Sequence, residues 1–582
     1  MYTSEGRKID RNCPLNDYPT PQFARDSFFC LNGLWDFCLD ENPTNHSQYP
    51  QKILVPFSPE TPLSGIETKV TARHTMHYRK VFELPAGFKG ERVLIHFEAI
   101  DQIADVYLNG VKIAHHEGGY LPIVADCLEL RPGQNELLVD AYDDTNSEVF
   151  PRGKQSLKPK NIWYHATSGI WGSVWLESVP RQVIQNLRIT PLFDEKSVRI
   201  EAQFEGKAER TELIISYLGR EVFHGQLNGN LSCVANLSRS FHPWSPEDPA
   251  LYDVILRINQ DEVKSYFGMR KFSMISHQGH TVFALNNKPY FLSGLLDQGY
   301  FPDGGMTPPS DAAMIYDIRF AKNLGFNMLR KHIKFENMRW YYHCDHIGII
   351  VIQDFISGGE PPKKRLFFTA PFFDLKINDT KQYSLLGRRN EQGRRYFEET
   401  MPLYVDRLYN VTSLAIWTLF NEGWGQFDSH RLTDKLRRLD PTRLIDSNSG
   451  WFDQSTEDGD IRSYHIYFGK MKRPAAGKRI LALSECGAYS YLVEGHYETN
   501  KRSFYRYYKS DKKLMAAIEK LYLKKMLPLL EKGLSIVVYT QLSDVEAETN
   551  GLVTYDRRVI KVKDKKMRGI NQKLTFKETP HD

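Results

Sequence analysis

Two glutamates in the sequence each follow a short, largely apolar run, from which a carboxyl group could do chemistry. Glu422 follows Trp417–Asn421, and Glu485 follows Ile480–Ser484. Hydrolysis of a glycosidic bond needs such a pair, because one carboxyl group protonates the leaving oxygen while the other, ionised, attacks the anomeric carbon or activates water. Retention needs the two about 5–5.5 Å apart, and inversion needs about 6.5–9.5 Å. A single glutamate after an apolar run is more often a surface residue, so the prediction depends on the two lying together.

Both glutamates fall in a region where strand-like and helix-like patterns alternate. Helical spacing of apolar residues predicts helices over Asp311–Leu324, with Ser310 as N-cap, and over Arg394–Leu408 and Asp511–Glu531. Eight strand candidates occur in this region, and eight β/α units in about 300 residues fit a TIM barrel. They are Phe291–Leu295, Asn327–His332, Gly348–Asp354, Ser413–Asn421, Arg443–Asp446, Ser463–Tyr467, Ile480–Glu485 and Leu534–Gln541.

Polar groups stand at the C-terminal ends of most of these strands, where a TIM barrel places its chemistry. The fourth and seventh strands lie across the barrel mouth, so Glu422 and Glu485 are predicted to face each other over a pocket. A solvated loop start would explain any one polar end, but not so many together. The end residues are Arg330, His332, Asp354, Asn421, Glu422, His465, Tyr467, Glu485 and Gln541.

The chain before the barrel has the pattern of two β-sandwiches. Short strand-like stretches such as Val93–Phe97 and Ala104–Leu108 are broken by turn signals such as Asn109-Gly110 over residues 20 to 180. From 181 to 275 the pattern continues, and Ser197–Phe204 alternates polar and apolar residues as a half-buried strand does. Neither region contains a long amphipathic helix.

The composition is that of an ordinary globular protein of several domains. The 582 residues carry a formal net charge of +5, and no basic block suits a nucleic-acid backbone. Aromatic residues make up 13%, which suits sugar stacking but also sandwich cores. Seven cysteines without a C-x-x-C pair, a polar N-terminus and no long apolar run predict a reduced, cytoplasmic protein with no membrane partner. We expect no metal and no cofactor, and the sequence is compatible with a homo-oligomer.

Several short motifs together resemble one known family. With them the chain resembles glycoside hydrolase family 2, the family of β-galactosidases, β-glucuronidases and β-mannosidases. The resemblance implies a jelly-roll sugar-binding-like domain at 1–180, an immunoglobulin-like β-sandwich at 181–275 and a catalytic TIM barrel at 276–582. The motifs are Tyr18–Phe23, Leu31–Phe37, Tyr107–Gly110, Gly118–Tyr120, Ser168–Trp171, Tyr266–Arg270, Asn327–His332, Asn421-Glu422 and Ser484-Glu485.

The resemblance also implies roles for individual residues. Glu422 becomes the acid/base and Glu485 the nucleophile. Asn421 would bind the sugar 2-hydroxyl, and Arg330 would keep the nucleophile ionised. The other residues expected to bind substrate are His332, Asp354, His465, Tyr467, Trp424, Tyr539 and Gln541, and Tyr300 is a further candidate for stacking on a sugar.

The chain departs from better-known family members around the sugar pocket. The third strand ends in Gln353-Asp354 where those members carry Asp-Glu, and the eighth strand lacks a Trp that many relatives have. The first strand continues as Asp297–Tyr300 rather than Asn-Arg-His. The loop after the eighth strand reads Glu548–Gly551, where β-glucuronidases carry Asn-x-Lys. These differences concern the substrate rather than the type of reaction.

Three functions therefore remain open at the level of sequence. The first is a retaining exo-β-glycosidase of the β-galactosidase kind, and the second is a β-glucuronidase or another exo-glycosidase of the family. The third is a non-catalytic carbohydrate-binding protein, which would predict the loss of one glutamate, whereas both are present. A metal hydrolase is disfavoured because no H-E-x-x-H pattern occurs, and His343 and His346 around Cys344 have the spacing of structural residues in a helix.

Overall fold

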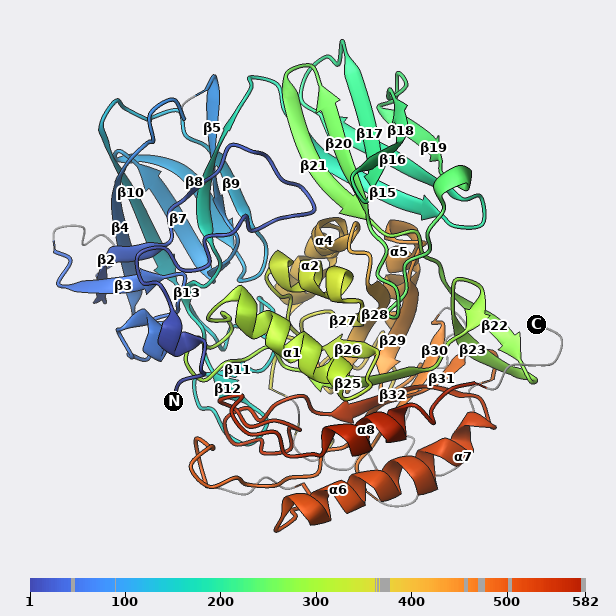
Figure 1. Cartoon of the computed structure of the whole chain (residues 1–582). Coiled ribbons are helices and arrows are strands. Elements are labelled where there is room, and N and C mark those ends of the chain that lie inside the picture. Colours follow the sequence, from blue (N-terminus) through green and yellow to red (C-terminus); the bar gives the residue numbers. More distant parts are fainter. Residues whose placement is uncertain are drawn as a thin grey trace.

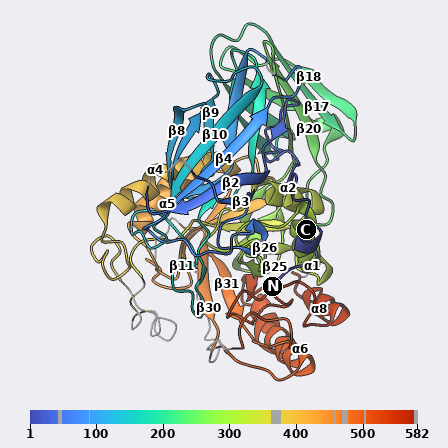
Figure 2. The same cartoon turned by 90° about the vertical axis from the view of Figure 1, so that its left-hand side faces the viewer.

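A computed structural model describes residues 1–42, 48–88, 90–361, 363, 366, 377–454, 459–468, 477–500 and 505–576. Two β-rich units, coloured blue and green in Figure 1, lie side by side against a barrel that runs from yellow to red. Figure 2 shows from a second side that both units lie over the same part of the barrel. Within the described residues, no helix is long and apolar enough to cross a membrane.

The first unit is a sandwich of two antiparallel sheets. One sheet has the order β3-β2-β4-β10-β7-β8 and the other the order β1-β14-β5-β9. Alternate residues of these strands point inward and form one apolar core that includes Trp35, Tyr78 and Phe97. Its strands are β1 Phe29–Cys30, β2 Gly33–Asp40, β3 Gln51–Val55, β4 Thr75–Glu83, β5 Arg92–Phe97, β6 Ile100–Asp101, β7 Ile103–Leu108, β8 Val111–Glu117, β9 Ile123–Asp126, β10 Gln134–Tyr142, β11 Gln155–Ser156, β12 Tyr164–His165, β13 Gly169–Ile170 and β14 Val174–Val179, with 3₁₀ turns at Gly6–Lys8 and Pro62–Ser64.

The second unit is a smaller sandwich with the sheet orders β15-β16-β19 and β18-β17-β20-β21. The buried guanidinium of Arg25 joins the two units, because it contacts Glu177 at 3.1 Å and Asp261 at 2.8 Å. The strands are β15 Ile184–Leu192, β16 Ser197–Phe204, β17 Thr211–Tyr217, β18 Arg220–Gly225, β19 Ser232–Asn236, β20 Tyr252–Ile258 and β21 Asp261–Phe267, with a 3₁₀ turn at Ser238–Ser240. A three-stranded sheet of β22 Phe272–His277, β23 His280–Leu285 and β24 Lys288–Pro289 follows before the barrel begins.

The third unit is a barrel of eight parallel strands in the order β29-β28-β27-β26-β25-β32-β31-β30. The strands at the two ends of this order, β29 and β30, are joined by a hydrogen bond from Ser463 Oγ to Asp446 Oδ1 at 3.0 Å. The strands are β25 Leu292–Asp297, β26 Met328–Lys331, β27 Ile350–Asp354, β28 Leu414–Asn421, β29 Leu444–Ser449, β30 Ile461–Ile466, β31 Ile480–Gly487 and β32 Leu534–Thr540.

The described helices pack outside the barrel strands. Ser310 caps the first of them, as predicted, because its side chain accepts a hydrogen bond from Ala313 N at 3.3 Å. The helix predicted over 511–531 is interrupted, because Leu521–Met526 forms a π-helical turn. The helices are α1 Asp311–Asn323, α2 Met338–Ile347, α4 Glu391–Leu408, α5 Ser429–Leu439, α6 Asp511–Lys520, α7 Leu527–Leu530 and α8 Asp564–Asn571.

The fold class is therefore the predicted one: a jelly-roll sandwich, an immunoglobulin-like sandwich and a (β/α)8 barrel. Each of the eight predicted barrel strands is present, with ends that differ by a few residues. Their C-terminal ends meet at one mouth, so the candidate residues at those ends lie close together.

Candidate active site

Arg330, from the end of β26, lies at the centre of the site. It is fully buried, and its guanidinium holds Asp354 with two hydrogen bonds of 2.9 and 3.0 Å. Its Nη2 donates to Asn421 Oδ1 at 2.8 Å, and its Nη1 donates to Glu485 Oε1 at 3.3 Å. One planar cation therefore fixes groups from three other strands, as a guanidinium fork is suited to do.

Glu485 is buried at the end of β31 and remains an anion. Burial raises the pKa of Glu485, but the charges of His465, His332 and Arg330 and a hydrogen bond from Tyr467 outweigh it, and the pKa falls to about 2. The Tyr467 hydroxyl donates to Oε2, which is the carboxylate oxygen that Arg330 does not contact. A carboxylate held ionised in a buried pocket has the properties of a nucleophile.

Glu422 follows β28 in an unusual backbone conformation. Its φ is +52°, in the left-handed region that a non-glycine residue rarely adopts. A hydrogen bond from its backbone N to Ser449 O at 3.0 Å holds this turn against β29. Such strain is often found at residues whose side chain must be aimed in one direction.

His465 lies between the two glutamates. Its Nδ1 is 2.8 Å from Glu422 Oε1, and its Nε2 is 3.6 Å from Glu485 Oε1. Ligand atoms of these three residues all lie within 4.8 Å of one another, so an oxygen of one glutamate comes that close to an oxygen of the other. In the part of the chain that the structure describes, this is also the one group of His, Cys, Asp and Glu that could hold a metal ion.

Two further predicted residues lie directly beside this group. His332 Nδ1 is 3.0 Å from Asp354 Oδ2, and burial lowers the pKa of His332. Burial raises the pKa of Asp354, but the charge of Arg330 and the contact with His332 outweigh it, so this carboxyl stays ionised. Asp354 therefore lies behind Arg330 as its anchor.

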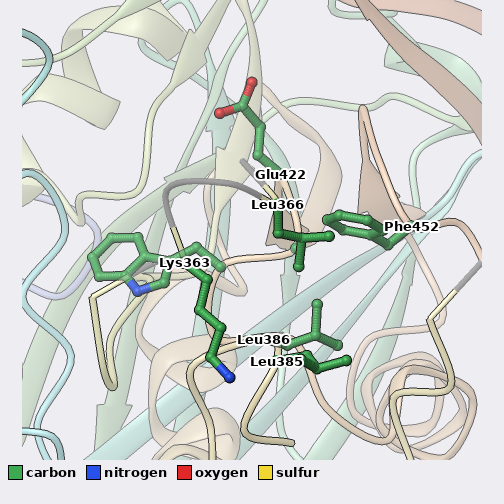
Figure 3. Close-up of a pocket in the computed structure, with 8 residues that line it drawn as sticks. Lys363, Leu366, Leu385, Leu386, Glu422 and Phe452 are labelled. Carbon is green, nitrogen blue, oxygen red and sulfur yellow. The ribbon is translucent and has the colours of Figure 1, made fainter. Parts of the chain in front are cut away.

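Trp424 borders the site on the side of Glu422. Its indole N–H donates to Glu360 O at 2.9 Å, and it lines a pocket together with Glu422 (Figure 3). Its ring meets the ring of Trp163, a residue of the first unit, edge to face at 4.9 Å.

Three of the predicted substrate-binding residues are not brought to the carboxylate pair. Tyr539 is 1% exposed and packs outside the barrel strands against Tyr489 and Tyr522. Gln541 is buried and bonded to Gln298 and Asn550 at 2.8 Å each, so it joins the loops after the first and eighth strands. Tyr300 is 3% exposed, with its ring against that of Tyr164 at 4.9 Å. Tyr539 therefore packs away from the mouth and is not the substrate contact that was expected, whereas substrate binding by Gln541 and Tyr300 stays a prediction.

A loop of the first unit, residues 151–165, crosses the mouth of the barrel and was not predicted to do so. Arg152 N and Gly153 N donate to Ser357 O at 3.1 and 2.9 Å, and the Tyr164 hydroxyl donates to Glu548. This loop also carries Trp163 and Lys154. The charge of Lys154 lowers the pKa of both Glu548 and His332. The site is therefore built by two units. The available sequence signal was a tryptophan and lysines in a long connection that also contains two prolines and one glycine.

At Gly153 the backbone of this loop packs tightly against the barrel. A Cβ there would lie 2.5 Å from Ile333 O, and its φ of +61° disfavours any side chain. We expect Gly153→Ala to displace the loop and to lower kcat/KM roughly 10- to 100-fold, since displacements of about 1 Å cost as much. Gly110→Ala is the matched control, because Gly110 has a φ of +84° and nothing within 4 Å. Equal effects of the two variants on kcat/KM would show that the loop contact is unimportant.

Arg330 should matter for stability as well as for turnover. Removing its guanidinium leaves Asp354 and Glu485 buried without their common cation, which typically costs about 3–5 kcal/mol. We therefore expect Arg330→Ala to lower both turnover and the denaturant midpoint, and Arg330→Lys to retain part of each. Arg395→Ala, at an arginine whose side chain is 65% exposed, should change neither. A stable Arg330→Ala protein with full turnover would contradict this role.

Family models match all three units of the chain. The model described as the galactose-binding-like domain of glycosyl hydrolase family 2 matches residues 57–164, the general family 2 model matches 182–270, and the family 2 TIM barrel model matches 278–486. The chain belongs to glycoside hydrolase family 2. Family 2 membership was the prediction from sequence, and it is confirmed.

Among family 2 proteins, the chain is similar to a β-galactosidase of Clostridium acetobutylicum, at 23% identity over 63% of this chain and 40% of that one. A β-glucuronidase of Streptococcus agalactiae is 24% identical over 70% of this chain and 68% of that one. The chain thus spans about two fifths of the length of the β-galactosidases it matches first. The solved β-D-glucuronidase of Dictyoglomus thermophilum has the same fold, with a TM-score of 0.73 at 17% identity over 95% of this chain and 98% of that one.

Proposed function

We propose that this family 2 protein is a retaining exo-β-glycosidase that hydrolyses terminal β-linked sugars. The observation that carries the proposal is the spacing of the carboxylates: oxygens of Glu422 and Glu485 lie within 4.8 Å. Retaining glycosidases hold their carboxyl groups about 5–5.5 Å apart, whereas inverting ones need about 6.5–9.5 Å to admit a water. The short spacing favours direct attack by a carboxylate.

In the first step, Glu485 attacks the anomeric carbon and forms a glycosyl ester, while Glu422 gives its proton to the departing oxygen. In the second step, the Glu422 carboxylate takes a proton from water, and that water displaces Glu485 with a second inversion. The pair Arg330 and Tyr467 supports this assignment, because both hydrogen-bond the anion that must attack. His465 supports it too, since its ring fixes Glu422 against the nucleophile.

A neutral hexoside is the preferred glycone, with a β-galactoside as the first choice. The loop after β32 carries Glu548, whose pKa is raised by burial and by the charge of Glu485, against the opposing charge of Lys154. Glu546 lies on the same loop, bonded to His165. A uronate would meet these acidic groups, although Lys154 offers one opposing charge. A β-glucuronidase remains the alternative, on the strength of the relative of that name.

A panel of 4-nitrophenyl β-glycosides tests the proposal. We expect hydrolysis of the galactoside at a kcat/KM at least about tenfold above that of the glucuronide, a difference of about 1.4 kcal/mol in transition-state binding. The configuration of the first-formed sugar, followed by NMR, should be retained. Cleavage of glucuronides but not galactosides would overturn the choice of sugar, and net inversion would overturn the mechanism.

A non-catalytic carbohydrate-binding protein is the alternative from another class. The buried, ionised Glu485 argues against it, because desolvating a charge without using it is costly. We also propose a cytoplasmic location, supported by the free thiols of the cysteines, which fit a reducing compartment.

A further inference from the structure

Two half-buried cysteines of the first unit, Cys13 and Cys30, have their thiols in contact. Cys30 is the second residue of β1, and Cys13 lies in the segment that precedes this strand. A hydrogen bond joins the two thiols, and both cysteines are free. Two sulfur atoms in contact need only a small movement to be joined, because a disulfide bond is about 2.05 Å long.

The backbone on both sides of the first cysteine is held against the residues that follow the second. The side chain of Asn32 donates to Pro14 O at 2.9 Å. On the other side, Asn12 O packs so closely on Gly33 that a Cβ there would overlap it. The Cys30 sulfur itself accepts a hydrogen bond from the backbone of Asn32. The contact between the two thiols is therefore built into the packing of the chain around them.

The surroundings give the two thiols different roles. The hydrogen bond from the Cys30 thiol lowers the pKa of Cys13 below that of a free cysteine, with help from the charge of Lys80, although burial and the charge of Asp10 oppose it. The same hydrogen bond and burial raise the pKa of Cys30. Exchange with a disulfide starts at a thiolate, and a neighbouring thiol then resolves the mixed disulfide. Cys13 has the properties of the attacking residue and Cys30 those of the resolving one.

We propose that Cys13 and Cys30 form a reversible disulfide when the protein meets a low-molecular-weight disulfide such as oxidised glutathione. The Cys13 thiolate attacks one sulfur of the oxidant, whose S–S bond breaks and releases one glutathione thiolate. Cys30 then gives its proton to that thiolate and attacks the Cys13 sulfur, which releases the second glutathione. The protein loses two electrons, and one oxidised glutathione becomes two reduced ones.

This disulfide would fasten a segment that joins the first unit to the barrel. Before Cys13, the backbone N of Thr3 donates to Asp303 Oδ2 at 2.8 Å, on the loop after β25. After Cys13, Arg339 of α2 donates to Tyr18 O at 3.0 Å. A cross-link at Cys13 removes conformations from the unfolded chain, so the disulfide should raise the thermal midpoint of unfolding.

Peptide mapping without reductant tests the bond. After equilibration with excess oxidised glutathione, a tryptic digest should contain residues 12–25 linked to residues 26–52, and fragmentation should place the link between Cys13 and Cys30. Dithiothreitol should remove the link. Cys13→Ser and Cys30→Ser should each abolish it. Cys233→Ser is the matched control and should leave the link intact, because Cys233 is also half-buried but burial raises its pKa.

Two further measurements check the roles of the two thiols and the effect of the bond. Cys30→Ser should retain one glutathione on Cys13, because the resolving thiol is missing. On oxidation the thermal midpoint of the wild-type protein should rise by a few degrees, and that of Cys13→Ser should not. The proposal is overturned if wild type shows no linked peptide, if wild type keeps glutathione on Cys13 without forming the link, or if the linked protein has an unchanged midpoint.

Discussion

Glu485→Gln should reduce turnover of every substrate by at least about 10⁴-fold, because an amide cannot form the glycosyl ester. The substitution preserves shape: an amide oxygen in place of Oε1 can still accept from Arg330, and the amide NH2 in place of Oε2 can donate to the Tyr467 hydroxyl. The protein should therefore stay folded, and the loss should appear in kcat for activated and unactivated glycosides alike. Initial rates with a dinitrophenyl and an alkyl glycoside of the same sugar measure both.

Glu391→Gln makes the same chemical change at a side chain that is 76% exposed on α4, and it should be silent. In the wild-type protein, a 2-fluoro sugar inactivator should label Glu485, which mass spectrometry would find in the peptide spanning Ile480–Tyr491. A label on any other carboxylate would refute the assignment of the nucleophile.

Glu422→Ala should fail in a different and more selective way. Without its proton donor, hydrolysis of an alkyl glycoside should fall by about 10²–10⁴-fold, the usual contribution of general acid catalysis. Formation of the glycosyl ester from a dinitrophenyl glycoside should change little, because that leaving group needs no proton. The glycosyl-enzyme should then accumulate, since no base activates water for the second step.

Added azide should restore turnover of the dinitrophenyl substrate by Glu422→Ala, because a small anion needs no general base. The product should be the β-glycosyl azide, which NMR identifies. An α-azide, or an equal loss on both substrates, would contradict the role of Glu422.

The strand pattern of the sequence predicted the barrel, but it could not predict which face each side chain occupies. Tyr539 closes a strand as the other site residues do, yet Ile536 and Val538 point into the barrel, and Tyr539 alternates outward to the helices. Glu485 shows the opposite case. Leu481 and Leu483 face the helices, and simple alternation would place Glu485 with them.

A local irregularity in β31 reverses that expectation for Glu485, the proposed nucleophile. The pairing of β31 with β32 shifts between Leu483 and Cys486, and its pairing with β30 shifts at His465. A β-bulge re-aims the side chains beside it, and here it brings Glu485 into the mouth while Cys486 packs outside. Periodicity alone does not reveal such a bulge. The resemblance to family 2 identified Glu485 because a sequence motif gives the position of the residue and does not depend on the register of the strand.

The crossing of the barrel mouth by residues 151–165 could not be predicted from the sequence, for another reason. Arg152 and Gly153 meet Ser357, and Tyr164 meets Glu548, across hundreds of residues of intervening chain. No local pattern encodes contacts between residues that lie so far apart in the sequence. The sandwich itself was predictable from its strands and turns, but its contribution to the site was not.

This crossing gives the protein two separate places where selectivity can change. The proposed reacting groups, Glu422 and Glu485, stand at the ends of barrel strands, where most substitutions would damage packing or charge balance. Trp163 and Lys154 stand on a surface loop of a different unit, which tolerates variation more easily than a strand does. A barrel produced on its own would keep both proposed reacting carboxylates and still lack the residues that the first unit lays across its mouth. We therefore expect that the substrate preference changes most easily, by engineering or in evolution, through replacement of this loop, which takes no part in the reaction.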